Sequence, residues 1–173
     1  MLRSDQVYLR RLERSDLGRC HEWINRPEIF GMMGVFGPRT RDEQEAWYDN
    51  VHSSRTNLVF ALCLTSGDTH IGNLSLFDVD YVNRNAGLTI FIADDAHRGK
   101  GYGAESVALL CEYAFAVLNL ERVYSKTDNP DAARMYERLG FAHEGTLRRH
   151  AYRDGGYVDK RVYGLLRGEL SHD

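Results

Sequence analysis

The pattern of hydrophobic and polar positions predicts strands at the start of the chain, followed by alternating helices and strands. Seven runs have the alternating or continuously apolar pattern of strands: 7–12, 58–64, 70–78, 86–92, 121–127, 141–152 and 160–166. A helical period over 103–118 places five apolar residues on one face: Val107, Leu110, Cys111, Ala114 and Leu118. This order predicts an α+β fold with a mixed sheet flanked by helices.

Short polar signals mark where the other elements begin and turn. Ser15 is expected to cap a first helix with Leu17, Cys20 and Ile24 inward, and Thr40 with Glu43 forms a capping-box pattern for a second helix ending near Val51. Ser66-Gly67-Asp68 and Asp154-Gly155-Gly156 are typical of hairpin turns. The first helix pair therefore precedes most of the sheet.

The helix after strand 121–127 has the clearest boundaries. Asn129 suits the N-cap, Pro130 the first helical position and Gly140 the left-handed stop. Spacing places Ala132, Met135 and Leu139 toward the core and Tyr136 on a neighbouring stripe. The Tyr136 phenol could then point into a cleft beside the strand, or pack with its hydroxyl in solvent.

A glycine-rich segment joins strand 86–92 to the helix over 103–118. Arg98, Gly101 and Gly103 follow the pattern Arg-x-x-Gly-x-Gly, which lets backbone N–H groups approach a phosphate at a helix N-terminus. A Walker loop fails because Asp94 occupies its first glycine position. A dinucleotide fingerprint fails because Ala104 occupies its last glycine position. A pyrophosphate cradle and a ligand-free turn remain open from the loop alone.

Composition favours one compact enzyme domain over residues 1–173. A net charge of −3 gives no reason to expect nucleic acid, and no apolar run suggests a membrane span or leader. Cys20, Cys63 and Cys111 are widely spaced, which favours reduced, buried thiols and a cytoplasmic location. The seven histidines show no metal-ligand spacing, so no metal site is expected.

Two motifs together resemble the GNAT superfamily of N-acetyltransferases, most closely the branch with ribosomal-protein N-terminal and spermidine acetyltransferases. They are Arg98-x-x-Gly101-x-Gly103 and the segment from Asn129 through Ala132, Arg134 and Tyr136 to Phe141. The resemblance implies a mostly antiparallel sheet whose fourth and fifth strands, 86–92 and 121–127, splay apart. It also implies acetyl-CoA as the co-substrate, and transfer of the acetyl group to a primary amine by direct attack.

The same resemblance implies site residues. The cofactor's pyrophosphate would be held by Arg98, Gly99, Lys100, Gly101, Tyr102 and Gly103. The pantetheine arm would lie along the backbones of Ile90, Phe91 and Ile92. Asn129 would add a hydrogen bond to its capping role, and Arg134 would reach the phosphates unless it is a solvated helix-face residue. Tyr136 would be the catalytic acid or hydrogen-bond the departing sulfur.

The acceptor is less clearly specified by the sequence. Candidate bases near strand ends are Asp78, Asp80, Glu144 and His150. Substrate choice is expected in the first two helices and the apolar loop 29–37, with Phe36 or Trp47 lining a pocket. A peptide N-terminus and a small-molecule amine both remain open, as does a homo-oligomer. A catalytically silent coenzyme A-binding regulatory domain is the alternative function.

Overall fold

The computed structural model describes residues 2–29, 37–153 and 155–171. In chain order the elements are β1 (Leu2–Arg3), β2 (Val7–Arg11), η1 (Arg14–Asp16), α1 (Leu17–Ile24), α3 (Arg41–Ser53), β3 (Leu58–Leu64), β4 (His70–Asp80), β5 (Asn85–Ile92), η2 (Asp95–His97), α4 (Tyr102–Ala116), β6 (Arg122–Thr127), α5 (Pro130–Arg138), β7 (Ala142–Arg153) and β8 (Gly156–Leu166). The strands form one eight-stranded sheet in the order β1-β2-β3-β4-β5-β6-β8-β7. The predicted mixed, mostly antiparallel α+β fold is confirmed.

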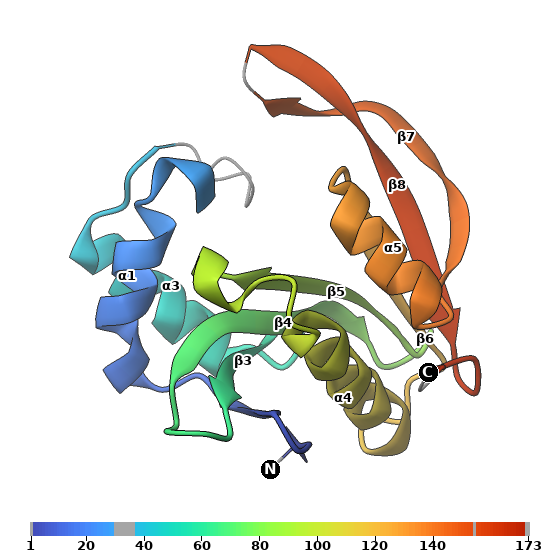
Figure 1. Ribbon diagram of the computed structural model, residues 1–173, viewed down its shortest axis with the longest axis horizontal. Coiled ribbons are helices and arrows are strands. Elements are labelled where there is room, and N and C mark those ends of the chain that lie inside the picture. Colours follow the sequence, from blue (N-terminus) through green and yellow to red (C-terminus); the bar gives the residue numbers. More distant parts are fainter. Residues whose placement is uncertain (1, 30–36, 154, 172–173) are drawn as a thin grey trace.

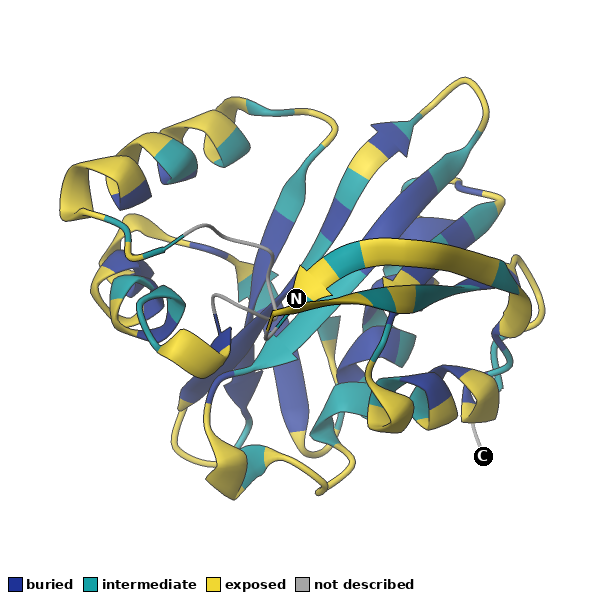
Figure 2. Ribbon diagram, turned by 90° about the horizontal axis from the view of Figure 1, so that it is seen from above, coloured by how far each residue is buried: buried dark blue, intermediate teal, exposed yellow. Residues whose placement is uncertain are grey.

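Helices cover both faces of this sheet (Figure 1). The helices α1 and α3 enclose a core around Trp23, Tyr48 and Ala61. On the other face, α4 and α5 enclose a larger core that contains Leu110 and Tyr136. Burial follows this division, with the helices exposed outward and the central strands β3, β4 and β5 largely buried between them (Figure 2).

The strands β5 and β6 separate after a short paired stretch. These strands pair in parallel at only three positions: Asn85 with Arg122, Ala86 with Val123 and Gly87 with Tyr124. Beyond Gly87, β5 stays paired with β4 while β6 stays paired with β8. Residues 88–92 therefore have an edge that no strand occupies, as the predicted splay requires.

Most predicted helix boundaries agree with the structure. Thr40 and Glu43 form the expected capping box of α3. The Asn129 side chain accepts a hydrogen bond from the Asp131 N–H at 2.8 Å, Pro130 begins α5, and Gly140 has a φ of 91°. These local rules succeed because each is satisfied by atoms within four residues.

Three predictions need correction. Ser15 does not cap α1: it lies inside η1, and the Asp16 carboxylate accepts the Glu13 N–H at 2.9 Å instead. The strand β1 was not expected, since two residues are too few to show a period. The last strand begins at Gly156 rather than 160, because the glycine-rich turn is tighter than predicted.

The core-facing stripe of α5 is also shifted by one position. Ala133, Tyr136 and Leu139 are buried, whereas Ala132 and Met135 are only partly buried. Both stripes satisfy a helical period, and the deciding factor is Ser125 on β6, which gives the Tyr136 hydroxyl a partner inside the protein. The alternative of a packing tyrosine with its hydroxyl in solvent is therefore wrong.

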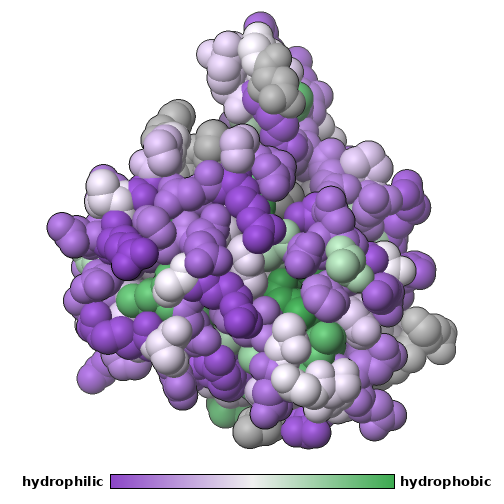
Figure 3. Space-filling view, turned by 60° about the vertical axis from the view of Figure 1, so that its left-hand side comes forward, coloured by the Kyte–Doolittle hydropathy of each residue, from purple (hydrophilic) through white to green (hydrophobic). Residues whose placement is uncertain are grey.

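The β7–β8 hairpin extends beyond the rest of the molecule, and Figure 3 shows it rising from a mostly hydrophilic face. As expected, Cys20, Cys63 and Cys111 are buried free thiols. Within residues 2–29, 37–153 and 155–171, no helix is long and apolar enough to cross a membrane. The same residues contain no cluster of three metal-ligating side chains.

Candidate active site

The glycine-rich loop between η2 and α4 has the backbone shape that its sequence predicts. Gly99 and Gly101 have φ values of 70° and 87°, and α4 begins directly afterwards at Tyr102. A Cβ added at Gly99 or Gly101 would meet no atom within 4 Å, so open space surrounds both. Free N–H groups, a helix N-terminus and the exposed Lys100 lie together here, which is a cradle suited to the pyrophosphate of coenzyme A.

The Arg98 side chain fastens this loop to β5. Its Nε donates to the Ile92 carbonyl at 2.9 Å, and its Nη1 donates to the Asp95 carboxylate at 2.5 Å. Two of the five guanidinium donors are therefore used within the loop. The groups free to meet an anion are the remaining guanidinium N–H groups, the backbone N–H groups of the loop and Lys100.

The unoccupied edge of β5 exposes main-chain groups of alternate residues. The Leu88 carbonyl accepts from Ser125 Oγ and the Ile92 carbonyl from Arg98 Nε, both at 2.9 Å, so neither points toward β4. In an antiparallel ladder this alternation continues, and Ile90 also faces the gap. Phe91 is the opposite case: its backbone faces its β4 partner Asn73. The expectation that Ile90, Phe91 and Ile92 offer their backbones together therefore needs correction at Phe91.

Tyr136 lies beside the point where the strands separate. Ser125 Oγ lies 2.9 Å from both the Leu88 carbonyl and the Tyr136 hydroxyl. Because Ser125 has one hydroxyl proton, it satisfies only one of these acceptors at a time. When Ser125 donates to Tyr136, the phenol proton is free to point elsewhere, so the pair can switch between two hydrogen-bonded arrangements.

Burial controls the acidity of Tyr136, whose side chain is 2% exposed. Burial raises the pKa of Tyr136 to about 12, and the Ser125 hydrogen bond opposes this only in part. A thiol titrates near pH 8.5, roughly 3.5 units lower, so full transfer of the phenol proton to a thiolate would cost about 5 kcal/mol. In this environment Tyr136 is better suited to donate a hydrogen bond than to give up its proton.

Asn129 and Arg134 lie at the N-terminal half of α5. Asn129 is exposed, and its side-chain oxygen accepts the capping hydrogen bond from the Asp131 N–H. Arg134 forms an ion pair with Asp131 on an exposed face of the same helix. Both side chains are accessible, but neither is oriented by contacts with the cradle.

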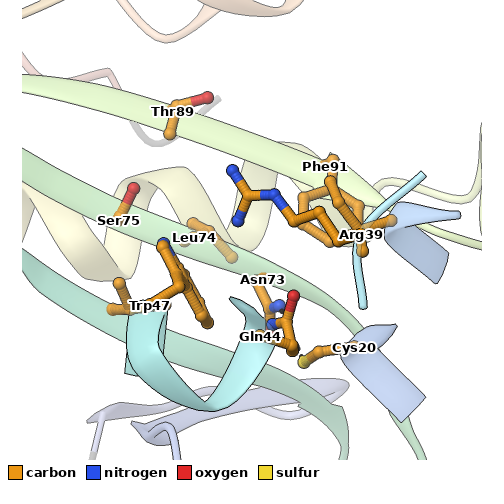
Figure 4. Close-up of a pocket in the computed structure, with 11 residues that line it drawn as sticks. Cys20, Arg39, Gln44, Trp47, Asn73, Leu74, Ser75, Thr89 and Phe91 are labelled. Carbon is orange, nitrogen blue, oxygen red and sulfur yellow. Dashed lines mark hydrogen bonds between the residues drawn. The ribbon is translucent and has the colours of Figure 1, made fainter. Parts of the chain in front are cut away.

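A cavity of about 230 Å³ lies on the opposite face, between α1, α3 and the central strands. We call it the acceptor cavity, and Figure 4 shows the side chains around it. Its lining residues are Cys20, Ile24, Arg39, Gln44, Trp47, Val59, Asn73, Leu74, Ser75, Thr89 and Phe91. Ser75 and Thr89 are register partners, and Thr89 follows Leu88, whose carbonyl meets Ser125. One end of the cavity therefore adjoins the strand gap.

The expected contribution of Trp47 to a pocket wall is confirmed, whereas Phe36 lies outside the described residues, as does the loop from 30 to 36. Sequence reasoning missed the polar lining residues Asn73, Ser75 and Thr89. Their signal was present: each is polar at an alternate position of an otherwise apolar strand, which places them on one face. Arg39 gave no comparable signal.

A buried polar chain supports the cavity from behind. Arg10 donates to both Asp16 carboxylate oxygens, at 2.7 and 2.8 Å. Asp16 Oδ1 lies 3.5 Å from Nδ1 of His70, whose Nε2 is 2.8 Å from Asn73 Oδ1. Asn73 Nδ2 in turn donates to Cys20 Sγ at 3.4 Å. This series of contacts, which begins at Arg10 on β2, thus fixes the cavity-lining side chains of Asn73 and Cys20.

The ionisation of this chain follows from burial and pairing. Burial acts to raise the pKa of Asp16, but the Arg10 and Glu13 hydrogen bonds outweigh it, so the pKa is lowered and the carboxylate is charged. Burial lowers the pKa of His70 despite the nearby Asn73 and Asp16. His70 is therefore neutral at pH 7.

None of the four candidate bases from the sequence lines the acceptor cavity. Glu144 is held by a two-pronged ion pair with Arg122, which lowers its pKa. The Asp80 carboxylate caps the turn after β4 through the Val82 and Asn83 N–H groups, and these bonds lower its pKa. Asp78 and His150 are exposed residues elsewhere on the surface. The described lining contains no carboxylate and no imidazole.

Comparison with known sequences places these features in context. The profile described as acetyltransferase (GNAT) domain matches residues 6–142. The chain is 32% identical over 165 residues to the spermidine N(1)-acetyltransferase of Vibrio cholerae, with 94% of each chain covered. It is 30% identical over 154 residues to the spermidine N(1)-acetyltransferase of Escherichia coli K12, covering 87% of this chain and 81% of that one.

A solved structure agrees with the sequence comparison. The crystal structure of spermidine N-acetyltransferase from Vibrio cholerae in complex with CoA and spermine superposes with a TM-score of 0.89. The match covers 96% of this chain and 98% of that one at 28% identity. The two chains therefore share the fold over nearly their whole length.

Proposed function

This chain belongs to the acetyltransferase (GNAT) family and is an acetyl-CoA-dependent N-acetyltransferase, and we propose that it acetylates a small primary amine bound in the acceptor cavity. The amine nitrogen attacks the thioester carbonyl carbon. A C–N bond forms, the C–S bond breaks, and a proton leaves the amine as the thiol is released. The observation that carries this proposal is the separation of β5 and β6, because the loop 98–103 follows β5 while Thr89 and Phe91 of the same strand line the cavity.

The gap-facing edge of β5 provides the stabilisation that this reaction needs. The Ile90 N–H points into the gap, where it would donate to the carbonyl oxygen as negative charge develops there. The carbonyls of Leu88 and Ile92 would accept hydrogen bonds from amide groups of the pantetheine arm. The Ile90 and Ile92 side chains approach Gly103, whose added Cβ would lie 3.8 Å from their Cδ1 atoms. Glycine at 103 thus keeps the start of α4 close to this edge.

Tyr136 would donate a hydrogen bond to the leaving sulfur. Ser125 supports this role, because donation from Ser125 to the phenol oxygen leaves the phenol proton free. With a pKa raised to about 12, Tyr136 stays protonated throughout the working pH range. The proton that ends on the thiol then originates on the attacking amine, and Tyr136 lowers the barrier by stabilising charge on sulfur.

The pyrophosphate would be held by the backbone of 98–103 and by Lys100, with the α4 N-terminus adding favourable charge. Tyr102 would cover one side of this cradle. Asn129 and Arg134 are exposed on α5, and a hydrogen bond to the pantetheine arm and a phosphate contact are proposed for them. Arg98 acts by holding the loop to Ile92.

The cavity supplies no side-chain base, and this affects which amines can react. An alkylamine with a pKa near 10.4 costs about 4–5 kcal/mol to deprotonate at pH 7, whereas an α-amine near 7.7–8.0 costs about 1 kcal/mol. Weakly basic amines would therefore react fastest at neutral pH. The rate should rise with pH as the free-amine fraction of each acceptor grows.

The test is release of coenzyme A thiol from acetyl-CoA across a panel of small amines and short peptides. We expect turnover with small amines, and little with peptides, because the cavity holds only about 230 Å³. Thermal stabilisation by CoA without turnover of any amine would instead favour a silent regulatory domain. Absence of stabilisation by CoA would overturn the proposal entirely.

A further inference from the structure

The main chain of Arg39 is clamped between the end of α1 and the start of α3. The Arg39 N–H donates to Asn25 Oδ1 at 2.6 Å, and the Arg39 carbonyl accepts from Asn25 Nδ2 at 3.0 Å. The same carbonyl accepts from His21 Nε2 at 2.9 Å. Three hydrogen bonds from one helix fix where this residue projects. Its side chain is therefore positioned by the fold rather than by a partner of its own.

The side chain of Arg39 points into the acceptor cavity, where its guanidinium lies among Phe91, Thr89 and Trp47 (Figure 4). Within the part of the chain that the structure describes, the guanidinium makes no hydrogen bond and no ion pair. Glu43, the acidic residue whose pKa it influences, is held by Thr40 at the α3 cap. A guanidinium has five donors and a permanent charge, so this cavity presents an unsatisfied anion-binding group.

The rest of the described lining is neutral. It has no aspartate or glutamate, and the sequence of 30–36 has none to add. The nearby acidic cluster on α3 faces outward, where Glu45 and Asp49 meet Arg14. The cavity therefore has a net positive charge from Arg39.

A second polar group without a described partner lines the same cavity. Gln44 is 4% exposed, and its Oε1 is buried without a hydrogen-bond partner. Among the other lining residues, Ile24, Val59 and Trp47 provide apolar side chains. An occupant that satisfies all three features has an anionic group, a further polar group and a compact apolar body.

We propose that the acceptor is a small amino carboxylate with an apolar body, whose carboxylate binds Arg39. This inference rests on the proposed acetyl transfer in the same cavity. The carboxylate neutralises the guanidinium and accepts its paired donors, and Gln44 completes the polar contacts. The amine is then directed toward Ser75 and Thr89, at the end of the cavity that adjoins the strand gap.

The proposal separates this chain from the relatives whose names specify spermidine. A polyamine has several ammonium groups at neutral pH and no anion. Placing it in a cavity with one guanidinium and no described carboxylate sets like charges together without compensation. Sequence identity of 30–32% with those relatives leaves ample room for a different acceptor.

The first experiment compares three amines that share one isobutyl group, leucine, leucinamide and 3-methylbutylamine, together with spermidine. Thiol release from acetyl-CoA at pH 8 gives kcat/KM for each. We expect leucine to exceed its amide and the simple amine by about 10- to 100-fold, the loss that follows from leaving a charged donor unpaired. The amide has the less basic amine, so this comparison is biased against the proposal.

The second experiment changes the charge at position 39. Arg39→Gln should abolish the preference for leucine over leucinamide, mainly through KM, and Arg39→Glu should make spermidine the better acceptor. Arg41→Gln is the matched control, because Arg41 is an exposed arginine outside the cavity lining. Thermal stabilisation by CoA should stay unchanged in all three variants.

Each contrary outcome identifies what has failed. Equal use of leucine and leucinamide, or faster use of spermidine or peptides by the unaltered protein, overturns the amino carboxylate assignment while leaving acetyl transfer intact. Loss of CoA stabilisation in Arg39→Gln would place Arg39 at the cofactor and overturn the assignment too. No transfer to any amine, with no stabilisation by CoA, overturns the proposed function itself.

Discussion

The two proposed halves of the active site are constructed differently. The cofactor half would consist mainly of backbone: the loop 98–103, the start of α4 and the open edge of β5. The acceptor half consists of side chains from α1, α3, β3, β4 and β5, aligned by a buried polar chain that begins at Arg10. A shared co-substrate can be held by conserved geometry of the main chain, whereas a particular amine must be selected by side chains. Substitutions in one half should therefore leave the affinity of the other half for its ligand unchanged.

The largest effect is expected on stability, when the Arg10–Asp16 pair behind the acceptor cavity is broken. Asp16→Asn leaves the Arg10 guanidinium with a weakened partner, and breaking a buried pair costs about 3 kcal/mol. Urea unfolding at pH 7 measures this loss, with the exposed Asp42→Asn as a control expected to change little. Stabilisation by CoA in the folded variant should remain, and its loss would contradict the separation of the two halves.

The same pair predicts how stability depends on pH. The folded-state pKa of Asp16 is lowered, so its contribution is fully present above the unfolded pKa of about 3.9 and is lost as the pH falls through the folded value. The difference in unfolding free energy between the unaltered protein and Asp16→Asn should therefore shrink below about pH 4. A difference that stays constant down to pH 2 would show that folding does not shift the pKa of Asp16.

Tyr136→Phe tests the junction between the halves. It removes one hydroxyl while keeping the ring packed against Phe141 and Tyr163. We expect kcat to fall by about 10²-fold, within the range for loss of one hydrogen-bond donor to developing charge, with the Kd for CoA unchanged. Single-turnover kinetics and calorimetry measure the two quantities. Unchanged kcat would remove Tyr136 from the mechanism.

Gly101→Val tests the cofactor half alone. A β-branched residue at a φ of 87° is strained by about 1–2 kcal/mol, so the loop must shift and CoA should bind roughly tenfold more weakly. Gly18→Ala is the control, since Gly18 lies in α1 with open space around it and no positive φ. The relative preference among acceptor amines should be the same in Gly101→Val as in the unaltered protein.

The difference between the halves also explains what the sequence could reveal. The backbone shape of the loop 98–103 and the caps at Thr40 and Asn129 were predictable because each depends on residues close together in the chain. The burial of the Tyr136 side chain was not predictable, because it depends on a hydrogen bond to Ser125, eleven positions earlier. Arg39 was not predictable either: its direction depends on hydrogen bonds to Asn25 and His21, fourteen and eighteen positions away.

Trp47→Ala measures the central claim most directly, namely that the acceptor cavity selects the amine while the cradle binds the cofactor. Trp47 lines the cavity on α3 and takes no part in the cradle. We predict that the KM for the preferred small amine rises about tenfold or more, with larger amines gaining relative to it, while the Kd for CoA is unchanged. Unaltered KM values across the amine panel, or an equal loss of CoA affinity, would contradict the account.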